Sequence, residues 1–437
     1  MWYGSSLTRR TFISTSAALG TVALLSTPLA AAESGAVNTF TVNVPEADLA
    51  ELRRRVVATR WPDRETVPDS SQGVQRSTLQ DLTSYWGTQY DWRRFEAKLN
   101  ALPQIMTEID GLAIHCIHVR SKHENALPLI VTHGWPGSII EQLKIIEPLT
   151  NPTAYGGSSS DAFHVVIPSI PGYGFSGRPT TTGWGPARIA RAWVVLMKRL
   201  GYSQFLAQGG DLGAVITEVM AEQAPPELLA MHTNLPGTIP PDIIKALSCG
   251  DPPPAGLSPE EKTAYLQAQD LRTKHFAYAA EMATRPQTLY GLADSPVALA
   301  AWLIDHGDGW GQPAPPILSA ILGQTVDGHP SGAVTRDDVL DNITLYWLTN
   351  TGVSAARSYW ENARGGIPPL NAVNVSIPAA VTIFPGEIYQ APRSWTERAF
   401  HKLIYYNRVD KGGHFAAWEQ PQLFAQEVRA GFRSLRK

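Results

Sequence analysis

Residues 105–235 show one pattern of hydrophobic and polar positions, in which short apolar runs alternate with stretches of helical spacing. The apolar runs predict strands at 113–119, 127–132, 164–168, 205–207 and 228–235. The stretches between them predict helices at 138–149, 186–200 and 214–220. Strands that alternate with helices of this length favour an α/β fold, with a largely parallel sheet covered by helices on both faces.

The segment before this region, residues 39–104, has a pattern of its own. Residues 40–44 alternate as an edge strand does, and Pro45 begins a helix. One face of that helix is apolar and contains Leu49, Leu52 and either Val56 or Val57. The stretch 85–95 is rich in aromatic residues, so we expect this N-terminal segment to wrap around and bury against a larger body.

Residues 236–372 lose the alternation of strands and helices. This stretch has helical spacing, proline-rich breaks and many aromatic residues, and we interpret it as an inserted helical lid. The strand pattern resumes at 379–384 and 402–407, within a second core segment that spans 373–437 and closes with a helix at 420–435.

Residues 206–220 connect a buried strand to a helix through a turn of small residues, Gly209–Gly213. Small residues around one reactive residue in such a turn are typical of a nucleophile elbow, which exposes that residue at the carboxyl end of the sheet. The central residue is Asp211, whose carboxylate attacks carbon without a base to activate it. Alone, the same pattern also fits an aspartate that caps a helix.

Two later residues complete a catalytic order. Glu387 follows the strand at 379–384, and His414 lies in a glycine-rich loop before the last helix. The order nucleophile, acid, histidine is that of the α/β-hydrolase fold. We expect His414 to deprotonate a water molecule and Glu387 to orient and stabilise the imidazole, with Asp211 as the nucleophile.

The loop at 133–136 offers hydrogen-bond donors to this site. The backbone N–H groups of Trp135 and Leu212 are expected to form an oxyanion hole for the ester of Asp211. Because these donors belong to the main chain, the side chain at position 212 matters less. His133 is expected to hold the loop in place.

Composition narrows the function further. A net charge of −3 and a pI near 6.4 give no basic footprint for a nucleic acid. The two cysteines, Cys116 and Cys249, do not form a disulfide framework, and we expect Cys116 to be a buried structural thiol. No CxxC or HExxH spacing predicts a metal site, and we expect no cofactor.

The N-terminus has the features of an export signal. Residues 8–13 form a twin-arginine pattern, followed by a weakly apolar run to Leu29 and a small-residue cleavage site at 30–32. We expect a bacterial protein that is exported to the periplasm or the medium, with residues 1–32 removed. The alternative is an uncleaved membrane anchor, which Pro28 and the many Ser and Thr residues disfavour.

Four motifs stand out along the chain: HGWPGS at 133–138, PSIPGYGFS at 168–176, QGGDLG at 208–213 and GGHFAAWEQP at 412–421. Together they resemble one family, the microsomal-type epoxide hydrolases, and the resemblance covers nearly all of the chain after residue 32. Residues 61–63 and 85–100 are similar to that family's N-terminal region.

The resemblance also implies two lid tyrosines, Tyr278 and Tyr359, which match the family's own pair. A phenol, with a pKa of about 10, can donate a hydrogen bond to an epoxide oxygen and a proton to the leaving alkoxide. Tyr290 and Tyr346 are the nearest rivals. Leu212 departs from the family, which usually has Trp after the nucleophile, and this change puts the substrate in doubt.

These features predict an epoxide hydrolase that forms a vicinal diol from a small-molecule epoxide and water through an ester at Asp211. The alternative enzyme is a haloalkane or haloacid dehalogenase, which uses the same kind of triad. A non-catalytic ligand-binding relative is the third hypothesis. The identity of the epoxide and the oligomeric state stay open, with a homodimer as one option.

Overall fold

A single sheet carries the fold. The computed structural model describes residues 35–364, 370–371 and 373–436, so the predicted export signal at 1–32 lies outside the described residues. The sheet order is β1-β2-β3-β5-β4-β6-β7-β8-β9. The strands are β1 (Val37–Thr39), β2 (Gln104–Ile109), β3 (Leu112–Val119), β4 (Leu127–Thr132), β5 (Phe163–Pro168), β6 (Phe205–Gly209), β7 (Leu228–Thr233), β8 (Val375–Ile383) and β9 (Phe400–Arg408). Strands β4 to β9 run parallel, while β1, β2 and β3 add an antiparallel edge.

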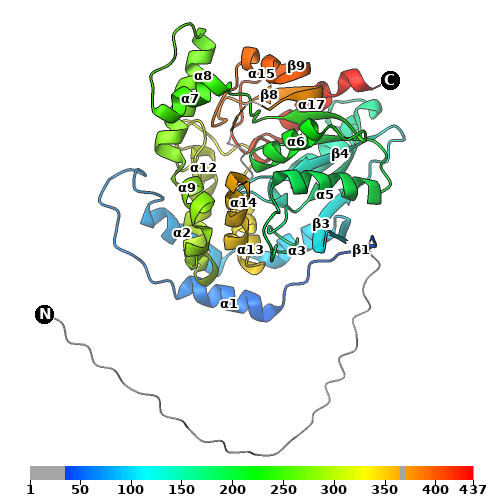
Figure 1. The fold of residues 1–437 in the computed structure, drawn as a ribbon. Helices are drawn as coiled ribbons and strands as arrows, with labels where there is room; N and C mark the ends of the chain where they lie inside the picture. Colours follow the sequence, from blue (N-terminus) through cyan, green and yellow to red (C-terminus); the bar gives the residue numbers. More distant parts are fainter. Residues whose placement is uncertain (1–34, 365–369, 372, 437) are drawn as a thin grey trace, which may run out of the picture. The chain divides into compact units, whose positions relative to one another are not determined.

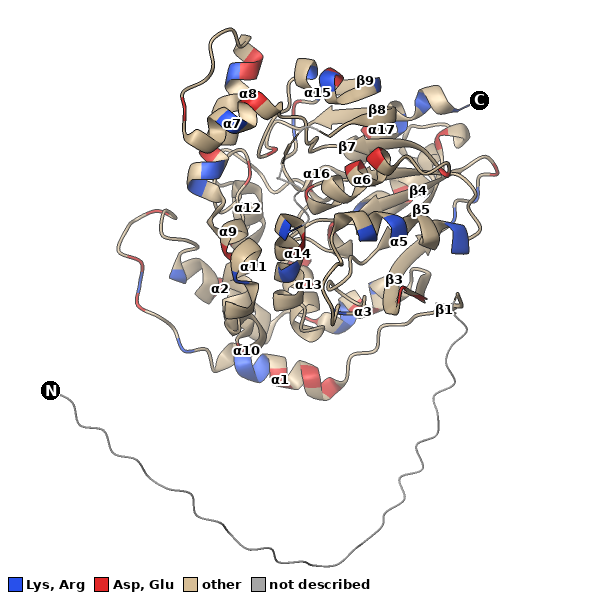
Figure 2. Ribbon diagram, viewed as in Figure 1, with Lys and Arg blue, Asp and Glu red and all other residues tan. Residues whose placement is uncertain are grey.

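The strands predicted within residues 105–235 and 373–437 are confirmed, with ends that differ by a few residues. All of β6 is buried, and Figure 2 shows that β4, β5 and β7 carry no Lys, Arg, Asp or Glu. Strands that are buried throughout need cover on both faces. Helices α5 (Pro186–Arg199) and α6 (Leu212–Gln223) contact each other, as do α4 (Ile146–Thr150) and α17 (Pro421–Gly431). The structure therefore has the mostly parallel α/β-hydrolase sheet, covered by helices, that the sequence predicts.

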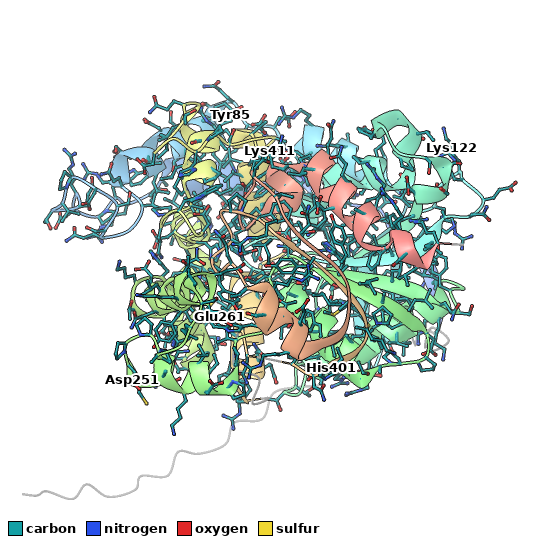
Figure 3. All side chains as sticks on the ribbon, turned by 90° about the horizontal axis from the view of Figure 1, so that it is seen from above. Tyr85, Lys122, Asp251, Glu261, His401 and Lys411 are labelled. Carbon is teal, nitrogen blue, oxygen red and sulfur yellow. The ribbon has the colours of Figure 1, made fainter. Side chains whose placement is uncertain are left out.

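The lid is helical and enters between β7 and β8. Its helices are α7 (Pro241–Cys249), α8 (Pro259–Asp270), α9 (Ala277–Thr284), α10 (Gly291–Asp294), α11 (Pro296–Ile304), α12 (Pro315–Leu322), α13 (Arg336–Leu348) and α14 (Gly352–Arg364). In Figure 1 they stand beside the sheet in green and yellow. Figure 3 shows Asp251 and Glu261 of the lid on one side and Lys122, between β3 and β4, on the other.

The N-terminal segment packs on this lid. Its helices α1 (Glu46–Val57), α2 (Arg76–Thr88) and α3 (Trp92–Asn100) contact α11, α12 and α13. The indole of Trp86 donates a hydrogen bond to Thr344 (3.0 Å), and the hydroxyl of Tyr90 donates one to Asp341 (2.7 Å). The expectation that the aromatic stretch buries against a larger body is confirmed, and the lid is that body.

On α1, Leu49, Leu52 and Val56 are buried, whereas Val57 is 75 % exposed. The sequence left open whether Val56 or Val57 lies on the apolar face of this helix, and the structure shows that Val56 does. Across the described ranges, no helix combines the length and the apolar character that a membrane crossing requires.

The predicted edge strand at 40–44 is wrong. The edge strand is β1, three residues earlier, and side chains of α3 bind the backbone that follows it. Asn100 accepts from the N–H of Val42 (2.8 Å) and donates to its carbonyl (2.8 Å), and Glu96 accepts from the N–H of Val44 (2.7 Å). These groups satisfy the backbone without a strand partner.

Other local predictions need correction. The helix predicted at 138–149 begins as a 3₁₀ helix, η1 (Ile139–Ile145), and becomes α-helical only in α4. Its start is held by the hydroxyl of Ser138, which accepts from the N–H of Ile140 (3.2 Å). Strand β2 and helix α15 (Arg393–Ala399) were not predicted, and the predicted closing helix at 420–435 ends earlier, as α17.

We predict that Asn100→Ala lowers stability, because it leaves the N–H and the carbonyl of Val42 without their partner. The expected loss is about 1–3 kcal/mol of unfolding free energy, read as a lower urea midpoint. Asn38→Ala, at an exposed position of β1, is the control and should leave the midpoint unchanged. Equal midpoints for the two variants would show that the side chain of Asn100 does not hold this segment.

Candidate active site

Asp211 stands in a turn that only small neighbours permit. It joins β6 to α6 with a φ of 50° and a ψ of −128°, a backbone conformation that costs a non-glycine residue about 1–3 kcal/mol. A β-carbon on Gly209 would lie 2.1 Å from the carbonyl oxygen of Gly213, and one on Gly213 would lie 2.0 Å from that of Thr132. The glycines therefore allow the close packing that fixes the elbow.

The structure brings the three predicted triad residues together. Nε2 of His414 lies 3.2 Å from Oδ2 of Asp211, and its Nδ1 lies 2.5 Å from Oε1 of Glu387. The three residues follow β6, β8 and β9, which run parallel in one sheet, so they meet beyond the carboxyl ends of these strands. The side chains of His414 and Glu387 are buried, and that of Asp211 is 17 % exposed.

Electrostatic attraction between His414 and the two carboxylates sets the pKa values of this triad. Burial alone would lower the pKa of His414, but the carboxylates of Glu387 and Asp211 outweigh it and hold that pKa well above its usual value. Burial alone would raise the pKa of Asp211, but His414, His306 and the N–H of Trp135 outweigh it and lower the pKa. Asp211 is therefore ionised at neutral pH.

Asn234 is a site residue that the sequence analysis missed. Its amide nitrogen donates to Oε2 of Glu387 (3.1 Å), and its amide oxygen accepts from Gln208 (3.1 Å). The N–H of Ile388 donates to the other oxygen of Glu387 (2.9 Å). Asn234 directly follows β7, and its position at a strand end was the only available signal.

The loop after β4 supplies a donor to the nucleophile. The N–H of Trp135 donates to Oδ1 of Asp211 (2.9 Å), where an oxyanion would form. Leu212 is the first residue of α6, so its N–H is one of the donors that a helix leaves free. His133 accepts from the N–H of Ile170 (3.2 Å), a contact that holds the loop as expected.

The two lid tyrosines face the nucleophile. Tyr278 on α9 and Tyr359 on α14 have ring centroids 6.1 Å apart, and they lie 4.8 and 5.8 Å from the ring of Trp135. Both line a cavity with Asp211. Burial raises the pKa of both phenols and the negative charge of Asp211 raises it further, so both stay protonated donors.

The rival tyrosines do not line this cavity. The side chain of Tyr290 is largely exposed, with 68 % of the residue accessible. The hydroxyl of Tyr346 is buried and donates to the carbonyl of Gly137 (2.7 Å). The geometry therefore separates the two tyrosines implied by the family resemblance from the other two candidates.

His306, which follows α11 in the lid, is a second residue that the sequence analysis missed. Its ring centroid lies 4.9 Å from that of His414 and 5.3 Å from that of Tyr278. Burial and the neighbouring His414 lower its pKa to about 3, so the ring is neutral. No local pattern distinguishes it from other buried histidines.

Glu141 lies behind the nucleophile and was also missed. It accepts from the N–H of Gly134 (3.3 Å), and burial, then the charge of Asp211, raise its pKa to about 7. Glu141, Asp211 and His414 line a separate cavity of about 20 Å³, room for about one water molecule.

Cys116 is buried in β3, as predicted, while Cys249 is exposed at the end of α7. Within the described parts of the chain, no group of three or more His, Cys, Asp and Glu residues is placed to hold a metal ion.

Comparisons with known proteins match the chain to two family profiles and to several relatives. The profile described as "Epoxide hydrolase N terminus" matches residues 37–142, and "alpha/beta hydrolase fold" matches 128–267. A relative named "Putative epoxide hydrolase" from Stigmatella aurantiaca (strain DW4/3-1) is 49 % identical over 401 residues, 92 % of this chain and 86 % of the relative. "Epoxide hydrolase 1" of Sus scrofa is 33 % identical over 417 residues, 92 % and 89 % of the two chains.

A solved structure shows the same likeness. Juvenile hormone epoxide hydrolase from the silkworm Bombyx mori has a TM-score of 0.79 and 29 % identity, over 92 % of this chain and 96 % of that one.

We predict that Asn234→Ala slows turnover about tenfold, the effect of losing one hydrogen bond of about 1.4 kcal/mol to Glu387. The measurement is the initial rate of diol formation from an epoxide. Asn374→Ala removes an exposed amide outside the site and is the control. A wild-type rate for Asn234→Ala would show that Glu387 is positioned without it.

Proposed function

We propose a two-step covalent mechanism for this chain, which belongs to the microsomal-type epoxide hydrolases and converts an epoxide and water into a vicinal diol. The observation that supports the mechanism is the contact set of Asp211. One carboxylate oxygen lies against His414 and the other against the N–H of Trp135. Tyr278 and Tyr359 line the cavity in front of it.

The first step opens the ring. Oδ2 of Asp211 attacks one oxirane carbon and forms an ester bond as the carbon–oxygen bond of the ring breaks. The released oxygen takes a proton from Tyr278 or Tyr359. Because both phenols are buried and protonated, they also bind the epoxide oxygen before the proton moves.

The second step hydrolyses the ester. Forming the ester removes the charge of Asp211, one of the two carboxylates that hold the pKa of His414 high. The pKa of His414 then falls, and its proton passes to the tyrosinate left by the first step. The neutral ring can then take a proton from water, with Glu387 stabilising the imidazolium. The hydroxide adds to Cγ of Asp211, and the N–H groups of Trp135 and Leu212 stabilise the oxyanion.

The intermediate then collapses. The bond between Cγ of Asp211 and the diol oxygen breaks, and the diol oxygen takes its proton from the new carboxyl group. His414 keeps the proton that it took from water, so Asp211 ends ionised and His414 ends protonated, as they began. Asp211 has gained one oxygen from water. The cycle uses an epoxide, water and the chain's own side chains.

We predict that His414→Gln stalls the second step and accumulates the ester. The variant is incubated with aryl and alkyl epoxides, and the peptide containing Asp211 is weighed. The expected mass gain equals one intact epoxide. An unmodified peptide together with full diol formation would contradict a covalent intermediate.

Two further variants locate the chemistry within the same assay. Asp211→Ala added to His414→Gln should give no adduct, because the nucleophile is missing. Tyr278→Phe with Tyr359→Phe in that background should also give none, because the epoxide oxygen is not protonated. Haloalkanes in parallel test the dehalogenase alternative, which requires an alkyl adduct with halide release.

We propose in addition that the chain is exported through a twin-arginine pathway. The support is the pattern at residues 8–13 and the small-residue site at 30–32. Full-length chain expressed in a bacterium is predicted to reach the periplasm or the medium with a new N-terminus near Glu33. Arg9→Lys with Arg10→Lys is expected to retain the protein in the cytoplasm, and equal export of both forms would refute the signal.

A further inference from the structure

The cavity at the nucleophile continues along one side of α6. Leu212, Val215 and Glu218 all line it, at a spacing of three residues that places them on one face of the helix. Glu218 is seven residues beyond Asp211, a rise of about 10 Å along the helix. The cavity, of about 70 Å³, therefore begins at the reacting carboxylate and reaches a second carboxyl group.

Glu218 is an unusual residue for such a wall. It is buried, with 3 % exposed, and one oxygen accepts from the N–H of Gly237 (2.7 Å). Its other oxygen has no hydrogen-bond partner among the residues that the structure describes, and no cation pairs with it there. Burial raises its pKa to about 8, so at neutral pH the group is mostly a neutral acid that can both donate and accept.

A second polar group borders the same cavity. Asn362 on α14 lies one turn beyond Tyr359, and its amide oxygen is buried without a hydrogen-bond partner in the described part of the chain. An acceptor buried in this way costs about 1–3 kcal/mol unless a donor reaches it. The remaining wall is mainly apolar: Leu212, Val215, Leu235, Phe276, Leu370 and Ile388.

We propose that Glu218 and Asn362 bind a neutral hydrogen-bond donor of the substrate, a hydroxyl or primary amide placed about 10 Å from the oxirane. The chain between the two groups would be aliphatic, to match the apolar wall. This inference rests on the proposed function, since it takes Asp211 as the point of attack. It names the class of epoxide that this site selects.

A homologous series of terminal epoxyalkanols, each paired with the epoxyalkane of equal length that ends in methyl, tests the proposal. The readout is the ratio of kcat/KM within each pair. Wild type should favour the alcohol about tenfold at the length that places the hydroxyl about 10 Å from the ring. Hydrolysis of both members with no preference at any length would overturn the inference and leave the proposed function standing. Failure to hydrolyse any epoxide would overturn the proposed function itself.

Substitutions in the cavity wall test which residues cause the preference for the alcohol, measured as the ratio of kcat/KM within each pair. Glu218→Met, of similar length but apolar, should bring the ratio close to one, whereas Glu218→Gln keeps a neutral donor and acceptor and should preserve it. Asn362→Leu is an independent variant that should also reduce the ratio. Gln223→Met, at an exposed position of α6, is the matched control for the loss of a polar side chain and should keep it.

Thermal unfolding of each variant checks that it is folded. A folded Glu218→Met that keeps the wild-type ratio would overturn the role of Glu218. A Glu218→Gln variant that loses the ratio as fully as Glu218→Met would overturn recognition by a neutral group.

Discussion

The buried ion pair between Asp211 and His414 sets the conditions under which the rest of the site works. A carboxylate without a counter-charge in this place would take up a proton and lose its ability to attack carbon. His414 prevents this, and Glu387 in turn stabilises the charge on His414. Asn234 and Gln208 extend the support into the core. The charge of His414 is therefore shared between two carboxylates, and the elbow, the loops and the sheet edge hold the three groups in contact.

The N-terminal segment has a clear part in this arrangement although it contributes no residue to the triad. Its aromatic residues bind α13, where Thr344 and Asp341 accept their hydrogen bonds. The same lid carries Tyr278 and Tyr359 on neighbouring helices, since α9 and α14 pack together. The segment thus stabilises the element that presents the two phenols to the nucleophile.

The local sequence pattern predicts some of these features correctly and misses others. The elbow at Asp211 and the strand ends before Glu387 and His414 follow from spacing alone, because small residues and buried strands are local properties. Tyr278 and Tyr359 came only from family resemblance, since a lid tyrosine has no local mark. Asn234 and His306 are defined by what packs against them from distant parts of the chain. The edge strand was misplaced for the same reason, because Asn100 lies some sixty residues away from the backbone that it binds.

The proposed mechanism uses groups of the lid and groups of the core differently in its two steps. Under the proposed mechanism, ring opening needs groups from both sides, the carboxylate of Asp211 from the core and a phenol from the lid. Ester hydrolysis would take its base, His414, and the oxyanion donor of the Trp135 loop from the core, while the lid tyrosinate takes a proton back. A lid displaced before the attack would therefore block formation of the intermediate. The lid would thus control commitment to the reaction, because no ester forms until a lid phenol meets the epoxide oxygen.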